Sequence, residues 1–321
     1  MGVPGEFSRV YAIEAKVDLQ GADPRVTLKD IEEIFIRATD ELGAVRGVII
    51  HRSPAWFIVD EGKKTLEPLG MKGRELRALV SYVVADQFFL DEINGRFREI
   101  GVTVCGCFST LTGEAMLYLP DEERDRTAVL IDMGYLSTDV MAVEGDAVIF
   151  HKTIPMGGGL MAADVAYGLS IPLTAAEQIK RSYVFGLSTG QETFDAALEG
   201  GRTQTFTHDQ VAEVLEPRVE EIAEAVKNCI ADSGVRLGNW STVYLTGGGV
   251  AINRGGRDYL AGKLDRPVRE LPRKAVKLSS PAYSSALGLL DLIIDTIERT
   301  HAPASGLLGG IKEFFRSLFG G

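Results

Sequence analysis

The sequence has few cysteines and no pattern of metal ligands. Only Cys105, Cys107 and Cys229 occur in the 321 residues. The first two are spaced two apart in an apolar stretch, so they share one face of a predicted strand and are poorly placed to bridge each other. No second pair of Cys or His completes a zinc site. We therefore expect three reduced thiols with structural roles.

Long apolar runs and an excess of basic charge are also missing. No apolar run reaches the ~18 residues of a membrane-spanning helix, and no secretory signal peptide is recognisable, so we expect the body of the protein in the cytoplasm. Acidic residues outnumber basic ones by 45 to 34, a formal net charge of −11. A chain of this charge lacks the basic footprint that nucleic-acid phosphates require, which argues against a nucleic-acid partner.

The hydrophobic pattern predicts strands mixed with helices. Strands are expected over residues 9–19, 48–50, 57–59, 77–84, 102–107, 129–131, 139–143, 147–154 and 243–246. Helices are expected over residues 28–38, 92–100, 160–167, 174–185, 211–233 and 283–300, and residues 188–209 form a polar stretch without a predicted element. Glycine-rich turns after buried strands in a chain of this length predict an α/β fold in more than one lobe.

A first candidate site follows the strand at residues 129–131. This strand ends in Asp132-Met-Gly134, and a turn with hydroxyl groups, Ser137-Thr138-Asp139, leads into the next strand. In phosphate-binding turns, backbone N–H groups and hydroxyls face the anion, and a carboxylate such as that of Asp132 orients Mg²⁺ through water. A plain β-hairpin with a glycine turn explains the same residues, and this alternative is favoured for the motif on its own.

A second candidate site is the glycine triplet Gly247-Gly248-Gly249, which follows the strand at residues 243–246. Glycines directly after a strand let the backbone approach a phosphate or an adenosine closely. A tight turn without a ligand is an equal alternative.

A third candidate is Thr174-Ala-Ala-Glu177-Gln-Ile-Lys180. Glu177 and Lys180 are three residues apart on one face of a predicted helix, where they can hold a ribose. The alternative, favoured for this motif alone, is that Thr174 and Glu177 form a capping box at the helix start.

The order of these motifs resembles one family of actin-like proteins. With Gly157-Gly158-Gly159 and Asp164-Val-Ala between them, residues 128–180 resemble the second half of a bacterial cell-division ATPase of the FtsA family. A second stretch resembles the signature of the small subdomain that is particular to FtsA, at His51, Pro54, Phe57, Val59, Asp60, Pro68, Gly70, Met71, Gly73 and Leu76. The resemblance runs from about residue 10 to residue 319.

This resemblance implies an α/β, actin-like fold with ribonuclease H-like lobes, an inserted small subdomain and a C-terminal amphipathic helix. The implied divisions are a remnant of the first lobe (1–24), the small subdomain (25–108), actin-like lobes (109–300), a linker (301–305) and a membrane-targeting helix (306–321). The implied cofactor is ATP with Mg²⁺, the ion being held by Asp132 through water. Its implied contacts are Asp132, Gly134, Ser137, Thr138, Asp139, Gly157, Gly158, Glu177, Lys180, Gly247, Gly248 and Gly249.

The resemblance also implies a function. An FtsA-like adaptor links the ring of the tubulin-like protein FtsZ to the cytoplasmic face of the membrane at the division site. Its implied partners are the C-terminal tail of FtsZ, bound between residues 180 and 243, further copies of itself in dimers or filaments, and membrane lipid. A PilM-like pilus assembly protein and a DnaK-like chaperone ATPase are alternatives that share the fold.

Two departures from the family pattern bear on catalysis. Nothing before Asp132 supplies the family's first phosphate loop, Asp-x-Gly-Thr or Asp-x-Gly-Ser, so we expect the chain to begin inside the first domain, either by truncation or by natural loss of that loop. Tyr135 and Leu136 stand where the family has glycines. Both departures predict nucleotide binding with weak or no ATPase activity.

The last residues predict a membrane contact. Seven large apolar side chains fall within roughly 140° of a helix surface: Leu307, Leu308, Ile311, Phe314, Phe315, Leu318 and Phe319. Such a helix is too short to cross a bilayer and lies in its interface. Docking of this helix on the protein's own core is the alternative.

Overall fold

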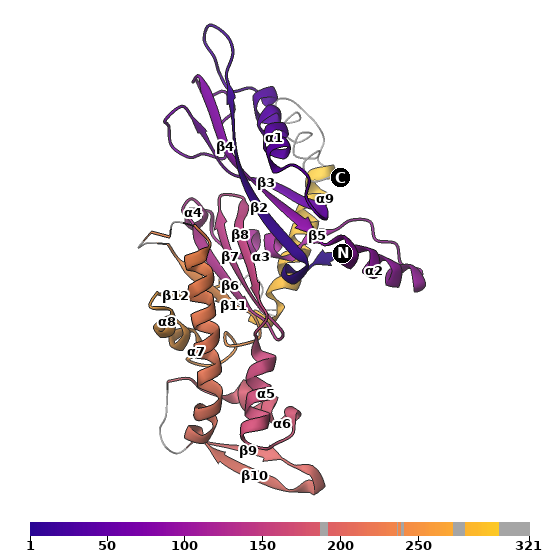
Figure 1. Cartoon of the computed structure of the whole chain (residues 1–321), viewed down its shortest axis with the longest axis vertical. Coiled ribbons are helices and arrows are strands. Elements are labelled where there is room, and N and C mark those ends of the chain that lie inside the picture. Colours follow the sequence, from indigo (N-terminus) through magenta and orange to yellow (C-terminus); the bar gives the residue numbers. More distant parts are fainter. Residues whose placement is uncertain (187–191, 236, 239–240, 272–279, 302–321) are drawn as a thin grey trace. The chain divides into compact units, whose positions relative to one another are not determined.

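A computed structural model describes residues 1–301 except 187–191, 236, 239–240 and 272–279 (Figure 1). The chain divides into two compact units. Unit 1 comprises Met1–Ala128, Met141–His151 and the residues from Ser285 onward. Unit 2 comprises Val129–Val140 and Lys152–Ser284.

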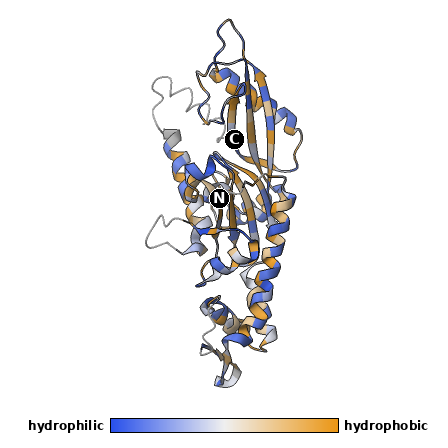
Figure 2. Ribbon diagram, turned by 90° about the vertical axis from the view of Figure 1, so that its left-hand side faces the viewer, coloured by the Kyte–Doolittle hydropathy of each residue, from blue (hydrophilic) through white to orange (hydrophobic). Residues whose placement is uncertain are grey.

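A three-stranded antiparallel sheet is the main feature of unit 1. It contains β2 (Ser8–Asp18), β4 (Glu75–Ala85) and β3 (Val48–Val59), in the order β2-β4-β3. Hydrophobic and hydrophilic residues alternate along its strands (Figure 2), as expected for a sheet with one face on a core. The strand predicted over residues 9–19 is β2. It is thus a member of the same sheet as β3 and β4, although residues 1–24 were assigned to a separate lobe.

Helix α1 (Leu28–Leu42) packs on this sheet (Figure 1). Its start is the predicted one, because Thr27 and Asp30 form a capping box in which each side chain accepts the other's backbone N–H. One face of the helix is buried, through Ile31, Ile34, Phe35 and Ala38. Each large apolar side chain in such a core contributes about 1.5–3 kcal/mol through its removal from water.

Strand β3 corrects one prediction. Residues 48–50 and 57–59 were expected as two short strands, but a single strand of 12 residues runs through both. Its pairing with β4 shifts register between Ile49 and His51 and again between Pro54 and Trp56. Pro54 has no backbone N–H to donate. It is tolerated because β3 is an edge strand and because the pairing with β4 is irregular at this position.

Backbone hydrogen bonds join residues 24–26 to residues 70–73, which belong to the segment that resembles the small-subdomain signature. Gly70 N–H donates to the Val26 carbonyl (2.8 Å), Val26 N–H donates to that of Met71 (2.9 Å), and Gly73 N–H donates to that of Pro24 (3.2 Å). The Asp60 carboxylate accepts the N–H groups of Arg74 and Glu75, and these bonds lower the pKa of Asp60. Gly70, Met71 and Gly73 therefore have structural roles within unit 1.

The remaining elements of unit 1 include two departures from prediction. Helix α2 (Gln87–Glu99) begins five residues before the expected start, where Asp86 caps it. The strand expected over residues 102–107 is absent, and the chain pairs only afterwards, when β5 (Phe108–Ser109) joins β1 (Gly2–Val3) in parallel. Val102 and Cys105 are exposed, while Cys107 is partly buried against the small core of Val3, Ala85 and Leu90. All three cysteines are free thiols, and of these Cys229 is buried.

Two helices of unit 1 meet at glycines. α3 (Thr110–Tyr118), which has no clear apolar face and is not among the predicted helices, contacts α9 (Ser284–His301). A Cβ at Gly113 would lie 2.5 Å from the carbonyl carbon of Gly288, and one at Gly288 would lie 2.5 Å from the Glu114 nitrogen. The buried Glu114 carboxylate accepts a hydrogen bond from the Ser285 hydroxyl. The two backbones therefore touch at a point that admits no side chain. Unit 1 also contains the short helices Gly5–Phe7 and α4 (Asp121–Arg124).

A five-stranded sheet has the order β12-β11-β6-β7-β8. β6 (Ala128–Met133) and β12 (Val268–Glu270) both pair in parallel with β11 (Val243–Thr246). β7 (Thr138–Glu144) and β8 (Ala147–Ile154) are joined by a turn at Gly145 and Asp146. β6 and β11 are almost completely buried, which explains why most of their residues are apolar.

The helices of unit 2 are α5 (Gly158–Gly168), α6 (Leu173–Ser182), α7 (His208–Asp232) and α8 (Gly256–Leu264). α7 packs against α5, where Arg218 binds the Asp164 carboxylate (2.6 Å). The polar stretch contains an unpredicted hairpin, β9 (Thr193–Ala197) and β10 (Thr203–Thr207), with the 3₁₀ turn Glu199–Gly201 between its strands. Only one side chain of each strand is buried, so the alternation was too weak to detect. A further 3₁₀ turn, Pro281–Tyr283, precedes α9.

A membrane contact at the C-terminus is not tested by this structure. The residues predicted for it lie outside the described residues: Leu307, Leu308, Ile311, Phe314, Phe315, Leu318 and Phe319. Within the described part of the chain, no individual helix has both the length and the apolar character to cross a membrane. Helices α5 and α6, which meet at a bend of 115°, are together long and apolar enough to do so, by length and composition alone.

Candidate functional site

The first predicted motif forms the turn between β6 and β7 in unit 2. Gly134 N–H donates to the Ser137 carbonyl and closes the turn (2.9 Å). The Thr138 hydroxyl donates to the Met156 carbonyl (2.7 Å), and the Asp139 carboxylate accepts from the Thr153 hydroxyl (2.6 Å). Thr138 and Asp139 therefore bind the neighbouring strand β8 and the residues after it.

The glycine triplet after β11 lies against this turn. Asp132, near the end of β6, is in register with Thr246 on β11. Gly247 has a φ of +94°, and a Cβ there would lie 2.3 Å from Asp132 Oδ1. Gly249 N–H donates to the Met133 carbonyl (2.7 Å). Glycine is therefore required at position 247, both by its left-handed conformation and by the nearby carboxylate.

The third motif reaches the same place through Gly158. Lys180 Nζ on α6 donates to the Gly158 carbonyl (3.1 Å) and pairs with Glu177 (2.8 Å). A Cβ at Gly158 would lie 3.0 Å from Lys180 Nζ and 3.1 Å from the Gly249 Cα. The structure thus brings together in unit 2 residues that are more than a hundred positions apart in the sequence.

The capping-box alternative for Thr174 and Glu177 is wrong. Helix α6 begins at Leu173, its N-cap residue is Pro172, and no side chain caps it. Thr174 consequently lies inside the first turn, where it cannot be the N-cap. Glu177 instead pairs with Lys180 and with Arg181 (2.7 Å).

Lys180 is a charged group with no exposed surface. Burial lowers the pKa of its ammonium group, and the hydrogen bond and charge of Glu177 oppose this effect. The ring of Tyr135 lies 5.3 Å from Lys180 Nζ, in a cation–π contact, while the tyrosine itself is about half exposed. Tyr135 thus covers the lysine.

The site has the kinds of residue that hold a nucleotide, but many of its hydrogen-bond donors are already used. Gly158 N–H donates to the Gly134 carbonyl (2.9 Å), and Gly159 N–H donates to that of Tyr135 (2.6 Å). A single carboxylate, Asp132, suits a Mg²⁺ ion that keeps most of its waters. Over the residues that the structure describes, no three His, Cys, Asp or Glu side chains form a metal-binding group.

Two residues at the site were not singled out from the sequence. The sequence shows Tyr135 only as a residue in the place of a family glycine, and it does not predict the contact with Lys180. Asn253, which is buried, donates from Nδ2 to the carbonyls of Lys180 (2.7 Å) and Tyr183 (2.9 Å). It thereby fixes the end of α6 to the segment after the glycine triplet. The sequence signal for Asn253 is weak: it is a polar residue directly after the apolar run Val250-Ala-Ile.

Comparison with known proteins gives two family matches. Residues 129–288 match the family described as "Cell division protein FtsA", and residues 5–84 match the "SHS2 domain inserted in FTSA". The FtsA of Bacillus subtilis is 22% identical over 90% of this chain and 66% of its own length. The FtsA of Pseudomonas aeruginosa is 27% identical over 90% of this chain and 71% of its own length. The chain therefore spans about two thirds of the length of these relatives.

Solved structures show the same fold. The chain is similar to a protein of the PilM–PilN type IV pilus biogenesis complex, with a TM-score of 0.54 and 18% identity over 88% of this chain and 75% of the other. It is also similar to MreB5 of Spiroplasma citri bound to AMPPNP, with a TM-score of 0.55 and 16% identity over 67% of each chain. These likenesses confirm the actin-like α/β fold. They carry no argument for a pilus function, since they concern the fold alone.

Proposed function

Because this chain belongs to the FtsA family of actin-like cell-division proteins, we propose that it links the FtsZ ring to the cytoplasmic face of the membrane at the division site. The observation that carries this proposal is the match of one chain to both FtsA-specific families, the actin-like part and its inserted SHS2 domain. The adaptor has three parts in this proposal: a surface for the FtsZ tail, a nucleotide site and a lipid-binding helix at residues 306–321.

A groove in unit 2 is the proposed surface for the C-terminal tail of FtsZ. It has a volume of about 430 Å³ and lies between α6 and β9, and all of its lining residues except Gln178 and Ile179 fall within the region 180–243 that the resemblance implies. Its lining residues are Gln178, Ile179, Ser182, Val184, Glu192, Thr193, Phe194 and Asp195. Glu192 Oε2 is buried and has no hydrogen-bond partner. An N–H or hydroxyl group of a bound peptide would satisfy this oxygen, whose unpaired state costs about 1–3 kcal/mol.

Replacing Glu192 with Gln tests this surface. The change removes the charge and half of the acceptor capacity but keeps the size of the side chain. We expect the affinity for a fluorescent peptide of the FtsZ C-terminal tail to fall about tenfold, which corresponds to about 1.4 kcal/mol. Fluorescence anisotropy measures this affinity. Glu213→Gln on the exposed face of α7 is the matched control and should leave the affinity unchanged.

Two results would count against the groove. Equal affinities of the Glu192→Gln variant and the unchanged chain would place the tail elsewhere. No saturable binding by the unchanged chain, together with no preference over a scrambled peptide, would remove the FtsZ adaptor proposal itself.

ATP with Mg²⁺ is the proposed nucleotide. Asp132 would hold the ion through water, and the ion would neutralise phosphate charge. Gly134, Ser137, Thr138, Asp139, Gly157 and Gly158 are the proposed phosphate side of the site, and Glu177, Lys180 and Gly247 to Gly249 the proposed nucleoside side. The hydrogen bonds among Gly134, Tyr135, Gly158 and Gly159 support weak binding, because they occupy amides that would otherwise face the phosphates.

We expect phosphate release from ATP to stay at background for this chain. Many of the donors in the glycine loops are engaged within the protein, and Tyr135 covers Lys180. A phosphate-release assay with the unchanged chain and with Asp132→Ala should give the same rate. A rate above background that disappears in the Asp132→Ala variant would show that the site is catalytic.

Self-association into dimers or filaments is a further part of the proposal. The small subdomain, proposed to extend over about residues 25–108 together with β2, offers its edge strand β2 to a second copy. The membership of the family supports this, and sedimentation at several protein concentrations tests it.

A further inference from the structure

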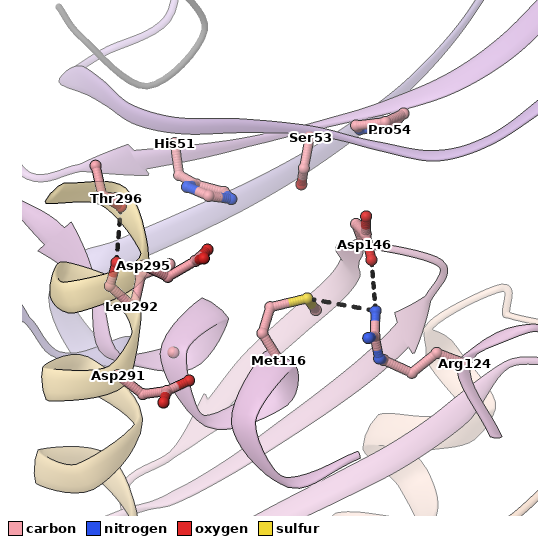
Figure 3. Close-up of a pocket in the computed structure, with 11 residues that line it drawn as sticks. His51, Ser53, Pro54, Met116, Arg124, Asp146, Asp291, Leu292, Asp295 and Thr296 are labelled. Atoms are coloured by element: carbon pink, nitrogen blue, oxygen red, sulfur yellow. Dashed lines mark hydrogen bonds and ion pairs between the residues drawn. The ribbon is translucent and has the colours of Figure 1, made fainter. Parts of the chain in front are cut away.

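A second cavity lies in unit 1, outside the proposed nucleotide site. It has a volume of about 270 Å³ and is lined by side chains from β3, α3, α9 and the turn between β7 and β8 (Figure 3). This is just below the ~300–1,000 Å³ of pockets for drug-sized ligands, so it suits a small molecule.

One polar group that faces this cavity has no partner. Ser53 on β3 is 3% exposed, and its hydroxyl makes no hydrogen bond in the protein. Figure 3 shows the hydroxyl directed into the cavity. A buried hydroxyl without a partner is unfavourable, and a ligand with a hydrogen-bonding group would satisfy it.

The charge of Arg124 is matched by the protein itself. Arg124 is buried, and its guanidinium donates to the Leu119 carbonyl (3.2 Å) and to the carboxylates of Asp121 and Asp146 (2.7 Å for Asp146). It also donates to the Gly145 carbonyl. This cation is therefore not available to hold an anionic ligand.

The opposite side of the cavity carries an excess of negative charge. Asp291 and Asp295 are four residues apart on α9, so they lie on the same face of the helix and repel each other. His51 lines the same region, and both His51 and Asp295 already have a partner in the protein. A cation bound beside the two aspartates would relieve their repulsion.

The arrangement favours an extended organic cation over a metal ion. Asp146, Asp291, Asp295 and His51 all line the cavity, yet in the described part of the chain no three such side chains come close enough to bind one ion. We propose that this cavity binds an aliphatic diamine or polyamine. One ammonium group contacts Asp291 and Asp295, and the other donates to Ser53 and Asp146.

Isothermal titration calorimetry of the full chain tests this proposal, with 1,4-diaminobutane as the probe and butylamine and MgCl₂ as comparisons. We expect one site for the diamine and at least tenfold weaker binding of butylamine, which lacks the second ammonium. Asp291→Asn and Asp295→Asn should each weaken diamine binding about tenfold. Ser53→Ala should weaken it about fivefold, as expected for the loss of one hydrogen bond of about 1 kcal/mol.

Glu298→Gln is the matched control, because it removes an exposed carboxylate from the same helix outside the cavity. Its affinity should equal that of the unchanged chain, and thermal melts should show that all variants are folded. The proposal is overturned if no diamine binds, if butylamine or Mg²⁺ binds as tightly as the diamine, or if Glu298→Gln weakens binding as much as Asp291→Asn. None of these results bears on the FtsZ adaptor proposal, which the peptide-binding experiment tests separately.

Discussion

Deletion of residues 306–321 should release this protein from liposomes, and Phe315→Glu should have the same effect. Burying the seven large apolar side chains halfway in a bilayer gains on the order of 7–10 kcal/mol before the cost of ordering the helix. Gly309 and Gly310 each reduce the stability of that helix by ~1 kcal/mol relative to Ala. Phe315 lies near the centre of the apolar arc, so a carboxylate at this position enters the part of the helix that is buried deepest.

Flotation with liposomes measures this effect. Ser317→Glu is the matched control, since it introduces the same carboxylate on the polar face of the predicted helix and should float like the unchanged chain. Anionic lipid should help only slightly, because the segment carries two basic residues and one acidic residue on a strongly acidic protein. If the unchanged chain, the deletion and Phe315→Glu all float alike, or if none floats, the segment is not the anchor and docking on the protein takes its place.

Gly288→Ala should destabilise the protein by about 2–3 kcal/mol, although alanine is the better helix former. The new methyl group would lie about 2.5 Å from the backbone of Glu114 on α3, where no flexible side chain can move aside. Helices α3 and α9 would therefore have to separate, and the buried pair of Ser285 and Glu114 would separate with them.

Gly95→Ala on α2 is the matched control for this substitution. A Cβ at Gly95 has nothing within 4 Å, so only the gain in helix propensity remains and stability should rise by up to about 1 kcal/mol. Urea unfolding followed by circular dichroism compares the two variants. The close contact between α3 and α9 would be contradicted if both substitutions shifted the urea midpoint of unfolding in the same direction.

Strong local patterns explain which elements the sequence predicted well. α1 has a capping box and one apolar face, and β2, β4 and α7 have long, regular periods, so each is found close to its predicted place. The hairpin of β9 and β10 buries only Ala196 and Phe206. In the apolar stretch at residues 102–107, Val102 and Cys105 are exposed and Cys107 is only partly buried. In both cases the packing of the folded protein, and not the local sequence pattern, determines the structure.

The candidate site shows a similar limit. The resemblance of the motif order to the FtsA family implied one shared site for Asp132, Gly158, Lys180 and Gly249. The sequence did not show that Lys180 is fully buried or that Tyr135 covers it, since neither contact is local in the chain. The capping box at Thr174 was plausible from spacing alone, but α6 begins at Leu173, directly after Pro172, so Thr174 lies within the first turn.

The contact of α3 with α9 has a consequence for synthesis on the ribosome. Unit 1 begins at Met1 but includes α9, which follows all of unit 2 in the chain. After α3 has been made, translation at about 5–20 residues per second takes on the order of ten to thirty seconds to reach α9. During this time the nascent chain presents the face of α3 around Gly113 without its partner helix. Unit 2 would therefore complete its fold before unit 1.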